Sequence, residues 1–342
     1  MSSDERWMRR ALDLAARGGR ATWPNPKVGC VLVKNGHVLA EGWHRKAGGP
    51  HAEAMALELA GPRAKGAVAY VTLEPCRAHL GKKTAPCADA LAAAGVARVV
   101  AAMKDPNPRV AGGGLAILRR AGVKTSVGLL AEESARLNGP FISVMRRRRP
   151  WVILKSALSL DGKAAAVGGA SRWITGPEAR KLVHDLRARV DAVLVGAGTA
   201  LIDDPALTAH GAGRDPIRVV LDGRMRLPKS ARLLKGSHKA FVFSARKRAL
   251  PGAEVIVVPA KDGLLDLKAV LAALADRKIG TLLVEGGPTV SASFLAAGYV
   301  DEVYAFFAPK LLAGTRNPNK APRLENPRLT RVGPDFLFYG RL

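Results

Sequence analysis

The sequence predicts an α/β protein of two domains, each built on its own sheet. The chain has 342 residues, enough for about two domains. Short apolar, β-branched runs alternate with helical patterns along its whole length, as in layered α/β folds. The run "MRRRRP" at residues 145–150 interrupts this alternation, because four arginines cannot be buried together and proline breaks regular structure.

We therefore expect a first domain at residues 1–145, a basic linker at residues 146–150 and a second domain at residues 151–342. A phosphate-binding arm is the other interpretation of the arginines. An exposed linker or a solvated helix end is the more common role of such a charge run.

The first domain begins with a predicted helix, in which Ser2 and Glu5 are spaced as a capping box. Strands are expected in "VGCVLV" and "HVLAEGWH", and the turn "KNGH" between them is typical of an antiparallel hairpin. Helices starting near His51, near Cys87 and in "GGLAILRRAG" separate the later strands "GAVAYVTLEP", "VARVVAAM" and "VKTSVGLL". A hairpin combined with helix-linked strands predicts a mixed sheet.

The second domain resumes the alternation at Trp151. Strands are expected in "WVILKSALS", "DAVLVGAGTAL", "PIRVVLDG", "KAFVFSA", "AEVIVVPA" and "IGTLLVEGG", with helices in "GPEARKLVHDLRARV" and "LKAVLAALADRK". Two closing strands are expected in "VDEVYAFFAPKLL" and "FLFYGRL". This pattern predicts a second α/β sheet.

The charge of the chain is strongly positive, with 54 Lys and Arg against 28 Asp and Glu, a net charge of +26. Nucleic-acid binding is one explanation, but the excess is spread along the chain and aromatic residues are only 5%, whereas single-strand binders interleave basic groups with rings. A preference for anionic small molecules explains the charge equally well. Neither a membrane-spanning run nor a signal segment is recognised, so we expect a soluble cytoplasmic protein, with a homo-oligomer left open.

The three cysteines are too few for a disulfide framework, which favours metal or thiol chemistry. Cys30 lies inside an apolar run and is interpreted as a small buried hydrophobic residue. His51, Cys76 and Cys87 supply one imidazole and two thiols, a ligand set of catalytic zinc, which leaves a fourth position for water. Glu53 is two residues from His51, so on a helix it points elsewhere and can carry protons.

Taken alone, His-x-Glu describes many solvated helix starts, and Pro-Cys is equally weak. In this order and combination they are the signature of zinc-dependent nucleobase deaminases. The motifs "TWPNPKVGCVLV", "HAEAMAL", "YVTLEPCRAH", "ARVVAAMKDPNPRVAGGG" and "LNGPFI" resemble the deaminase half of the bifunctional riboflavin-biosynthesis deaminase/reductases. The motifs "SLDGKAA", "WITGPEAR" and "DDPALT" resemble their reductase half, so the resemblance covers nearly the whole chain.

This resemblance implies an N-terminal cytidine-deaminase-like domain, a three-layer α/β/α structure with a mixed sheet, and a C-terminal dihydrofolate-reductase-like α/β domain. It implies that the first domain hydrolyses the 2-amino group of 2,5-diamino-6-ribosylamino-4(3H)-pyrimidinone 5′-phosphate. His51, Cys76 and Cys87 would bind one Zn²⁺, Glu53 would shuttle the proton, and Asn25 would contact the pyrimidine.

The segment between the two cysteines departs from the family pattern. "CRAHLGKKTAPC" is longer than the usual histidine-rich loop, keeps His79 and adds Lys82 and Lys83. The metal ligands survive this change, but the contact of the loop with substrate is in doubt. The lysines could serve the substrate phosphate, although a solvated loop tip is the more common role.

A nucleotide site is expected in the second domain without the usual dinucleotide fingerprint. "VGAGTAL" has Leu201 where the third glycine should stand, so a G-x-G-x-x-G reading fails. "LLVEGGPTVSASFL" places two glycines between an apolar strand and a helix start, where backbone N–H groups can bind phosphate. The glycines of a lone pair more often only make a turn.

The resemblance implies that the second domain reduces the ribosyl group to ribityl with NADPH. The residues it assigns to the substrate are Ser171, Arg187, Leu207 and Glu285, and those it assigns to NADPH are Trp173, Thr199, Asp203 and Gly287 onward. An arginine that the family often places after "DDPALT" is missing near His210. For Glu285, a buried carboxylate needs a partner, and a ligand hydroxyl is a reasonable one.

Each reductase residue also has a purely structural interpretation: Trp173 as core, Asp203 as a turn cap, and Arg187 as a solvated helical arginine. Two other functions remain open. The chain could be a tRNA or nucleobase deaminase whose basic C-terminal domain binds RNA. A zinc-stabilised RNA-binding protein without catalysis is less favoured, since structural zinc sites normally have four protein ligands.

Overall fold

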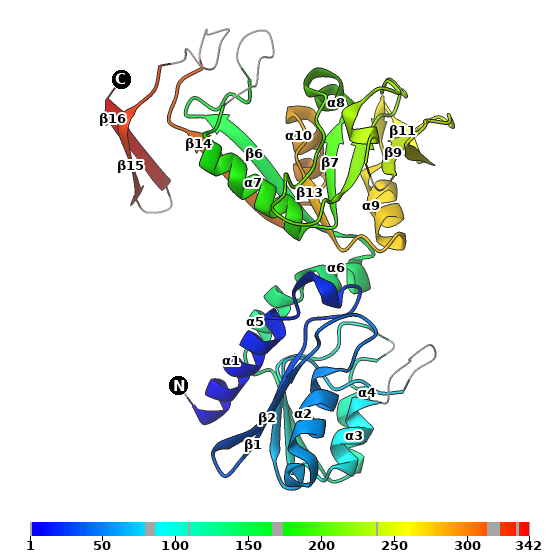
Figure 1. Cartoon of the computed structure of the whole chain (residues 1–342), viewed down its shortest axis with the longest axis vertical. Helices are drawn as coiled ribbons and strands as arrows, with labels where there is room; N and C mark the ends of the chain where they lie inside the picture. Colours follow the sequence, from blue (N-terminus) through cyan, green and yellow to red (C-terminus); the bar gives the residue numbers. More distant parts are fainter. Residues whose placement is uncertain are drawn as a thin grey trace. The chain divides into compact units, whose positions relative to one another are not determined.

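The structure is a computed structural model that describes residues 2–78, 86–108, 110–165, 174–236, 239–312, 322–332 and 335–341. The chain divides into two compact units, Met1–Arg149 and Pro150–Leu342, and each is described by itself (Figure 1). The division falls at the end of the arginine run. Arg146 and Arg147 form the last turn of a helix, and the carbonyl of Arg149 accepts a hydrogen bond from the Ser143 hydroxyl.

The first unit is a five-stranded mixed sheet in the order β2-β1-β3-β4-β5. Its strands are β1 (Gly29–Lys34), β2 (His37–Trp43), β3 (Val68–Val71), β4 (Arg98–Ala101) and β5 (Lys124–Val127). β1 runs antiparallel to β2 and β3, and β3, β4 and β5 are mutually parallel. The predicted mixed sheet is therefore confirmed.

The predicted hairpin is also confirmed. Asn35 and Gly36 connect β1 to β2 with φ angles of 50° and 76°. Positive φ at both central residues is the conformation that twists two-residue hairpins in the favoured sense, and Asn and Gly adopt it at least strain.

Helices cover both faces of this sheet (Figure 1). They are α1 (Ser3–Ala16), α2 (Ala52–Ala60), α3 (Cys87–Ala93), α4 (Gly113–Arg120), α5 (Ala131–Leu137) and α6 (Gly139–Arg147). Successive residues of β1 point to opposite faces: Cys30 and Leu32 pack with α2, α3 and α4, whereas Val31 and Val33 pack with α1. The unit has the predicted three layers.

The helix α1 begins as predicted, because the Ser2 hydroxyl accepts a hydrogen bond from the Glu5 N–H at 3.2 Å. Its buried face includes Met8 and Leu14. The helices α5 and α6 were not expected from the sequence.

Glu74, just after β3, is linked by side-chain hydrogen bonds to the start of α4. Its side chain is almost fully buried, and its two oxygens accept hydrogen bonds from the backbone N–H groups of Asp105, Gly112, Gly114 and Leu115 at 2.8–3.2 Å. Two of these groups belong to the first turn of α4, whose N–H groups have no partner within the helix. One carboxylate therefore shapes the segment that follows β4.

The second unit contains a seven-stranded parallel sheet in the order β10-β9-β8-β7-β13-β6-β14. Its strands are β6 (Trp151–Ser159), β7 (Ala192–Gly196), β8 (Ile217–Leu221), β9 (Ala240–Ser244), β10 (Ala253–Val257), β13 (Thr281–Val284) and β14 (Glu302–Ala308). A short ribbon, β11 (Ala260–Lys261) and β12 (Leu264–Leu265), follows β10. The predicted second α/β sheet is confirmed.

Helices again lie on both faces of the sheet. They are α7 (Pro177–Arg189), α8 (Ala197–Asp203), α9 (Leu267–Asp276) and α10 (Pro288–Ala296). The side chains of α7 and α8 pack in one core and those of α9 and α10 in the other. Across the described parts of both units, no helix combines the length and apolar character needed to cross a bilayer.

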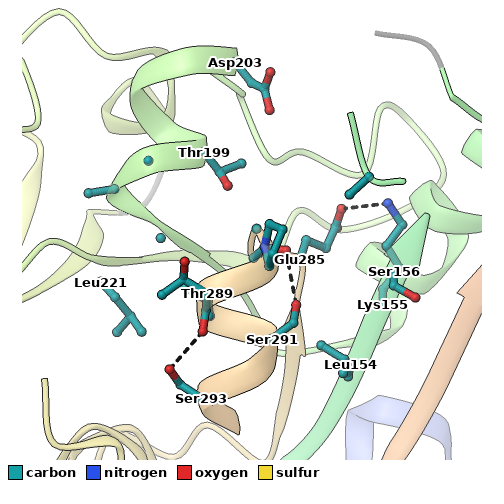
Figure 2. Close-up of a pocket in the computed structure, with 18 of the residues that line it drawn as sticks. Leu154, Lys155, Ser156, Thr199, Asp203, Leu221, Glu285, Thr289, Ser291 and Ser293 are labelled. Atoms are coloured by element: carbon teal, nitrogen blue, oxygen red, sulfur yellow. Dashed lines mark hydrogen bonds and ion pairs between the residues drawn. The ribbon is translucent and has the colours of Figure 1, made fainter. Parts of the chain in front are cut away.

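The strand order reverses between β7 and β13. After β7 the chain moves outward through α8 to β8, and after β13 it moves the other way, through α10 to β14 beyond β6. Ligands of open parallel sheets bind at such a switch point, beyond the carboxyl ends of the strands. A cavity lies there, lined by α8, by the start of α10 and by the ends of β6 and β8 (Figure 2).

The closing strands differ from expectation. β14 pairs in parallel with β6, while β16 (Asp335–Arg341) pairs antiparallel with β15 (Glu325–Val332). The strand β15 was not predicted, because "ENPRLTRV" contains Asn-Pro, a turn signal, and lacks apolar alternation.

Removing the Glu74 carboxylate should destabilise the first unit. Glu74→Ala leaves four N–H groups without their acceptor, two of them buried. Glu74→Gln replaces one acceptor by a donor, so we expect the Ala variant to lose roughly 3 kcal/mol or more. The measurement is urea denaturation followed by tryptophan fluorescence and circular dichroism, with each transition fitted separately. The control is Glu132→Ala, whose exposed i,i+4 pair with Arg136 should contribute under about 0.5 kcal/mol. Equal midpoints for the Glu74 and Glu132 variants would contradict this account.

Candidate active sites

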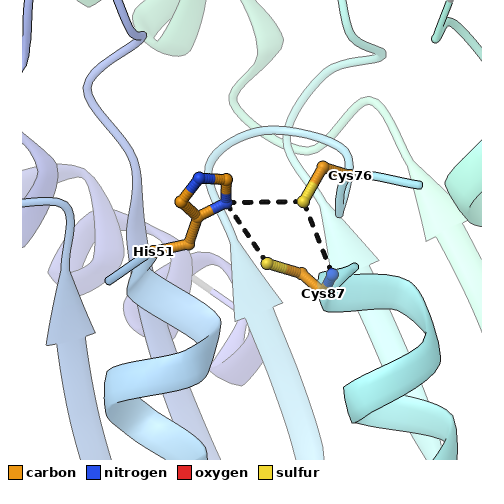
Figure 3. Close-up of side chains that lie close together, drawn as sticks. All are labelled: His51, Cys76 and Cys87. Atoms are coloured by element: carbon orange, nitrogen blue, oxygen red, sulfur yellow. Dashed lines mark hydrogen bonds between the residues drawn. The ribbon is translucent and has the colours of Figure 1, made fainter. Parts of the chain in front are cut away.

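Three side chains that are distant in sequence converge at one edge of the first unit (Figure 3). His51 is the N-cap residue of α2, Cys76 follows β3, and Cys87 is the first residue of α3. The His51 Nδ1 lies 3.4 Å from the Cys76 Sγ and 3.3 Å from the Cys87 Sγ. The three ligand atoms all lie within 4.8 Å of one another.

This arrangement fits zinc. With Zn–S near 2.3 Å and Zn–N near 2.0 Å, tetrahedral geometry separates nitrogen and sulfur ligands by about 3.5 Å, close to the separations between His51 and the two cysteines. The Cys87 backbone N–H also donates to the Cys76 Sγ at 3.4 Å. Such a donor at a helix start favours the thiolate, the form that binds metal. Three protein ligands leave one position for water, as in catalytic sites.

Glu53 lies in the first turn of α2, with 3% of its surface exposed. Burial, helped by the nearby Cys76 thiolate and opposed by His51, raises the pKa of Glu53 to about 7. A carboxyl group with that pKa can both accept and release a proton near neutral pH.

Asn25 is held by His44, which the sequence interpretation missed. The Asn25 Nδ2 lies 3.1 Å from the His44 Nε2, and the His44 Nδ1 lies 2.9 Å from the Pro50 carbonyl oxygen. Burial lowers the pKa of His44, so we assign a neutral ring that donates to Pro50 and accepts from Asn25. The only sequence signal was a histidine at the end of a predicted strand, seven residues before a proposed ligand.

Cys30 is fully buried among apolar side chains of the sheet, and burial raises the pKa of its thiol. Its interpretation as a small hydrophobic residue is confirmed. His79, Lys82 and Lys83, which raised the question of phosphate contact, lie outside the described residues.

In the second unit, the cavity at the switch point has a volume of about 2160 Å³. This exceeds the few hundred to 1,000 Å³ or so usual for a single small ligand. It brings together six of the eight residues expected in the reductase site: Arg187, Thr199, Asp203, Leu207, Glu285 and Gly287. The other two, Ser171 and Trp173, lie outside the described residues.

A buried ion pair occupies the floor of this cavity. The Arg187 Nε and Nη2 donate to the two oxygens of Glu285 at 2.6 and 3.0 Å, and the Lys155 Nζ lies 3.8 Å from the same carboxylate. Burial alone would raise the pKa of Glu285, but the Arg187 guanidinium, helped by Lys155, holds it below its ordinary value. The partner that a buried carboxylate requires is therefore a charged group of the chain, and the contact of Glu285 with a ligand hydroxyl stays a prediction.

The two glycines before α10, Gly286 and Gly287, let neighbouring groups lie close to the backbone because they carry no side chain. A Cβ on Gly286 would lie 2.5 Å from the Val290 Cβ, and one on Gly287 would lie 3.3 Å from the Thr199 Oγ1. Gly287 caps α10, so the free N–H groups of the first turn of the helix lie beside Thr199 and Ser291 (Figure 2). A helix start with no side chain over it is suited to a phosphate.

Two further histidines line the cavity and were missed. The rings of His184 and His210 stack with centroids 4.3 Å apart. Burial lowers the pKa of His184, and the charge interaction with His210 and Arg187 lowers it further. The spacing of His184 three residues before Arg187, on one helical face, was a usable signal.

Comparisons with known protein families match both units. The family model for the cytidine and deoxycytidylate deaminase zinc-binding region matches residues 1–103, and the model for the RibD C-terminal domain matches residues 150–338. The second match decides against the alternative in which a basic C-terminal domain binds RNA. The two domains have the predicted deaminase-like and reductase folds.

Relatives match over nearly the full chain. The riboflavin biosynthesis protein RibD of Escherichia coli is 43% identical over 98% of both chains. Among solved structures, Acinetobacter baumannii RibD is 39% identical with a TM-score of 0.83, covering 98% of both chains. A Thermotoga maritima diaminohydroxyphosphoribosylaminopyrimidine deaminase/5-amino-6-(5-phosphoribosylamino)uracil reductase is 38% identical with a TM-score of 0.80, covering 98% of this chain and 97% of that one.

These similarities, together with the His51, Cys76 and Cys87 cluster and the reductase cavity, identify the chain. It belongs to the RibD family, the bifunctional enzymes of riboflavin biosynthesis that combine a zinc-dependent deaminase with an NADPH-dependent reductase.

Proposed function

We propose that the first unit hydrolyses the 2-amino group of 2,5-diamino-6-ribosylamino-4(3H)-pyrimidinone 5′-phosphate, with His51, Cys76 and Cys87 holding zinc and Glu53 moving the proton. The observation that carries this proposal is that the His51 Nδ1 lies 3.3–3.4 Å from each of the two cysteine sulfurs, beside a buried carboxyl group.

Hydrolysis forms one C–O bond and breaks one C–N bond, and a proton must travel from water to the leaving amine. Bound zinc supplies the Lewis acid that activates the water. Glu53 accepts the proton and returns it to the amine, a role that suits a pKa near 7. Asn25, held by neutral His44, orients the pyrimidine.

We propose that the second unit reduces the ribosyl side chain of the deaminated product to ribityl. NADPH supplies the hydride, and the protein must align donor and acceptor carbons. Arg187, Leu207 and Glu285 bind the substrate at one part of the cavity. Thr199, Asp203 and the N–H groups following Gly287 bind the cofactor. Ser171 and Trp173 are proposed for the roles that the family resemblance implies.

The Arg187–Glu285 pair serves this reaction by holding the Arg187 guanidinium in a fixed orientation. Because Glu285 takes up two donors of Arg187, while Nη1 donates to the Thr208 carbonyl at 3.1 Å, the guanidinium is held in one plane. A ligand approaching the cavity meets a group that needs no reorganisation to bind.

We also propose a cytoplasmic location and self-association. The cysteines form no disulfide in the part of the chain that the structure describes, and this, with a pyridine nucleotide cofactor, suits a reducing compartment. The β15–β16 hairpin exposes Leu329, Val332, Leu337 and Tyr339 by 52–60%, an apolar surface of the kind that contacts another chain. Light scattering after size-exclusion chromatography tests for a homo-oligomer.

Glu53→Gln should abolish ammonia release while leaving reduction of the deaminated intermediate intact. The amide cannot shuttle a proton, so deamination should fall at least about 100-fold, with zinc still bound. Ammonia release and NADPH oxidation are measured separately on the purified protein. Glu58→Gln, on the exposed face of the same helix, is the matched control. Loss of both activities in Glu53→Gln would contradict two independent sites.

Cys87→Ser should remove the metal from the first unit. Loss of one of three ligands should reduce zinc from one ion per chain to a small fraction, measured by elemental analysis, and deamination should disappear with it. NADPH oxidation should be unaffected. Cys30→Ala is the control, since that buried thiol faces the core, and its zinc content should stay stoichiometric. Full zinc in the Cys87 variant would overturn the proposed ligand set.

Glu285→Gln should impair reduction alone. The neutral amide leaves the Arg187 charge unbalanced in a buried site, and we expect kcat/KM for reduction to fall at least about tenfold, with ammonia release unchanged. Glu254→Gln, which removes an exposed pair with Arg277, should have no effect on either activity. A Glu285 variant with wild-type reduction would exclude the ion pair from the reductase site.

A further inference from the structure

The reductase cavity extends well beyond the Arg187–Glu285 pair. Its far end lies at the carboxyl end of β8, where three basic side chains line it: Arg224, Arg226 and Lys268. In the sheet, β7 and β13 separate β8 from β6, which carries Lys155. Three interstrand spacings put the end of β8 roughly 14 Å from β6. Figure 2 shows Leu221 of β8 and Lys155 on opposite sides of α10.

On the proposed function, this layout assigns each part of the substrate and of the cofactor to one part of the cavity. The substrate and the nicotinamide meet beside Glu285, and the start of α10 lies in the middle, where the cofactor phosphates belong. An extended dinucleotide then places its adenosine at the end of β8. The basic cluster therefore faces the part of the cofactor in which NADPH differs from NADH.

The β7–α8–β8 segment resembles the start of a dinucleotide-binding unit. In such units a carboxylate at the end of the second strand accepts the ribose 2′-hydroxyl of NAD, whereas a nearby arginine accommodates the 2′-phosphate of NADP. Asp222 stands at that position, directly after β8. It is fully buried, its Oδ2 accepts the Leu227 N–H at 2.8 Å, and its Oδ1 lies 4.0 Å from the Arg226 Nε.

Asp222 is thus turned into the protein and closed to a ribose. The other carboxylate lining this end, Asp266, caps α9 by accepting the N–H groups of Lys268 and Ala269 at 2.8 and 3.2 Å. Neither carboxylate neutralises Arg224, which is exposed in the turn after β8 and has no ion pair with any residue that the structure describes. The end of the cavity is left with a positive charge.

The guanidinium of Arg224 lies beside the β11–β12 ribbon. Its Nη2 lies 3.6 Å from where a Cβ on Gly263 would stand, in the turn of the β11–β12 ribbon. Lys268 starts α9 on the same side of the cavity. Arg224 and Lys268 therefore both line the end of the cavity at which the adenosine ribose is placed.

We propose that Arg224, assisted by Lys268, binds the 2′-phosphate of NADPH and makes the reductase selective for NADPH over NADH. The inference rests on the proposed reductase function, and it adds a residue that the sequence motifs did not indicate. Arginine suits this role because its fork of donors matches two phosphate oxygens.

The test compares cofactors in the full-length protein carrying Arg224→Ala. The ratio of kcat/KM for NADPH to that for NADH should fall about 10- to 100-fold, the range expected for lost charge-assisted hydrogen bonds, while the NADH values change little. For Arg224→Lys, which keeps the charge but not the fork of donors, this ratio should lie between the wild-type value and the Arg224→Ala value. Arg246→Ala removes an exposed arginine that does not line the cavity and should keep the wild-type ratio.

A binding measurement separates this inference from the reaction itself. By calorimetry, adenosine 2′,5′-bisphosphate should bind the wild type more tightly than adenosine 5′-monophosphate, and Arg224→Ala should remove that difference. An unchanged preference in the variant, or an equal loss of NADPH and NADH efficiency, would overturn the assignment. A wild type that oxidises neither cofactor would refute the proposed reduction, whereas the bisphosphate preference would still report on Arg224.

Discussion

The direction of the strands in each sheet is the constraint on which both sites depend. In the first unit β1 runs antiparallel to both β2 and β3, so β2 and β3 end at the same edge. The start of α2 with His51 and the turn with Cys76 therefore meet there, next to the start of α3 with Cys87. In the second unit the parallel strands end together around the reversal between β7 and β13. Strand ends and helix starts bring unpaired N–H groups to both edges, which favours thiolates at one and phosphates at the other.

The two sites use burial in opposite ways. Glu53 is buried, and the opposing influence of His51 is smaller than the effect of burial, so its pKa rises to about 7 and its proton becomes mobile near neutral pH. Glu285 is also buried, but Arg187 and Lys155 hold its pKa low and keep it charged. The first carboxyl group is suited to carrying a proton, and the second to holding other groups in place. The same residue type thus supports different chemistry because its neighbours differ.

Much of the fold and of the zinc site could be predicted because the signals are local. The "KNGH" turn, the Ser2 cap and the alternation of β1 each depend on a few adjacent residues. His51, Glu53, Cys76 and Cys87 stand out because those residue types combine rarely without a metal. The helices α5 and α6, the strand β15 and the supporting roles of Glu74 and His44 were missed. The β15 sequence carries a turn signal and lacks apolar alternation, and Glu74 and His44 act through side-chain hydrogen bonds that no local pattern predicts. The four backbone groups that Glu74 holds lie 31 to 41 residues after it.

The sequence by itself determined most of the helices and strands, the α/β class of both units, and the presence of one histidine and two cysteines suited to zinc. These follow from periodicity, turn residues and ligand chemistry, all of which act over short stretches of chain. Only the tertiary structure decided that Glu285 is paired with Arg187, that Asp222 is turned inward, and that Arg224 is left to face the cavity. The physical reason is that the charge state and availability of a side chain are set by what packs against it, and those neighbours come from strands and helices that are remote in sequence.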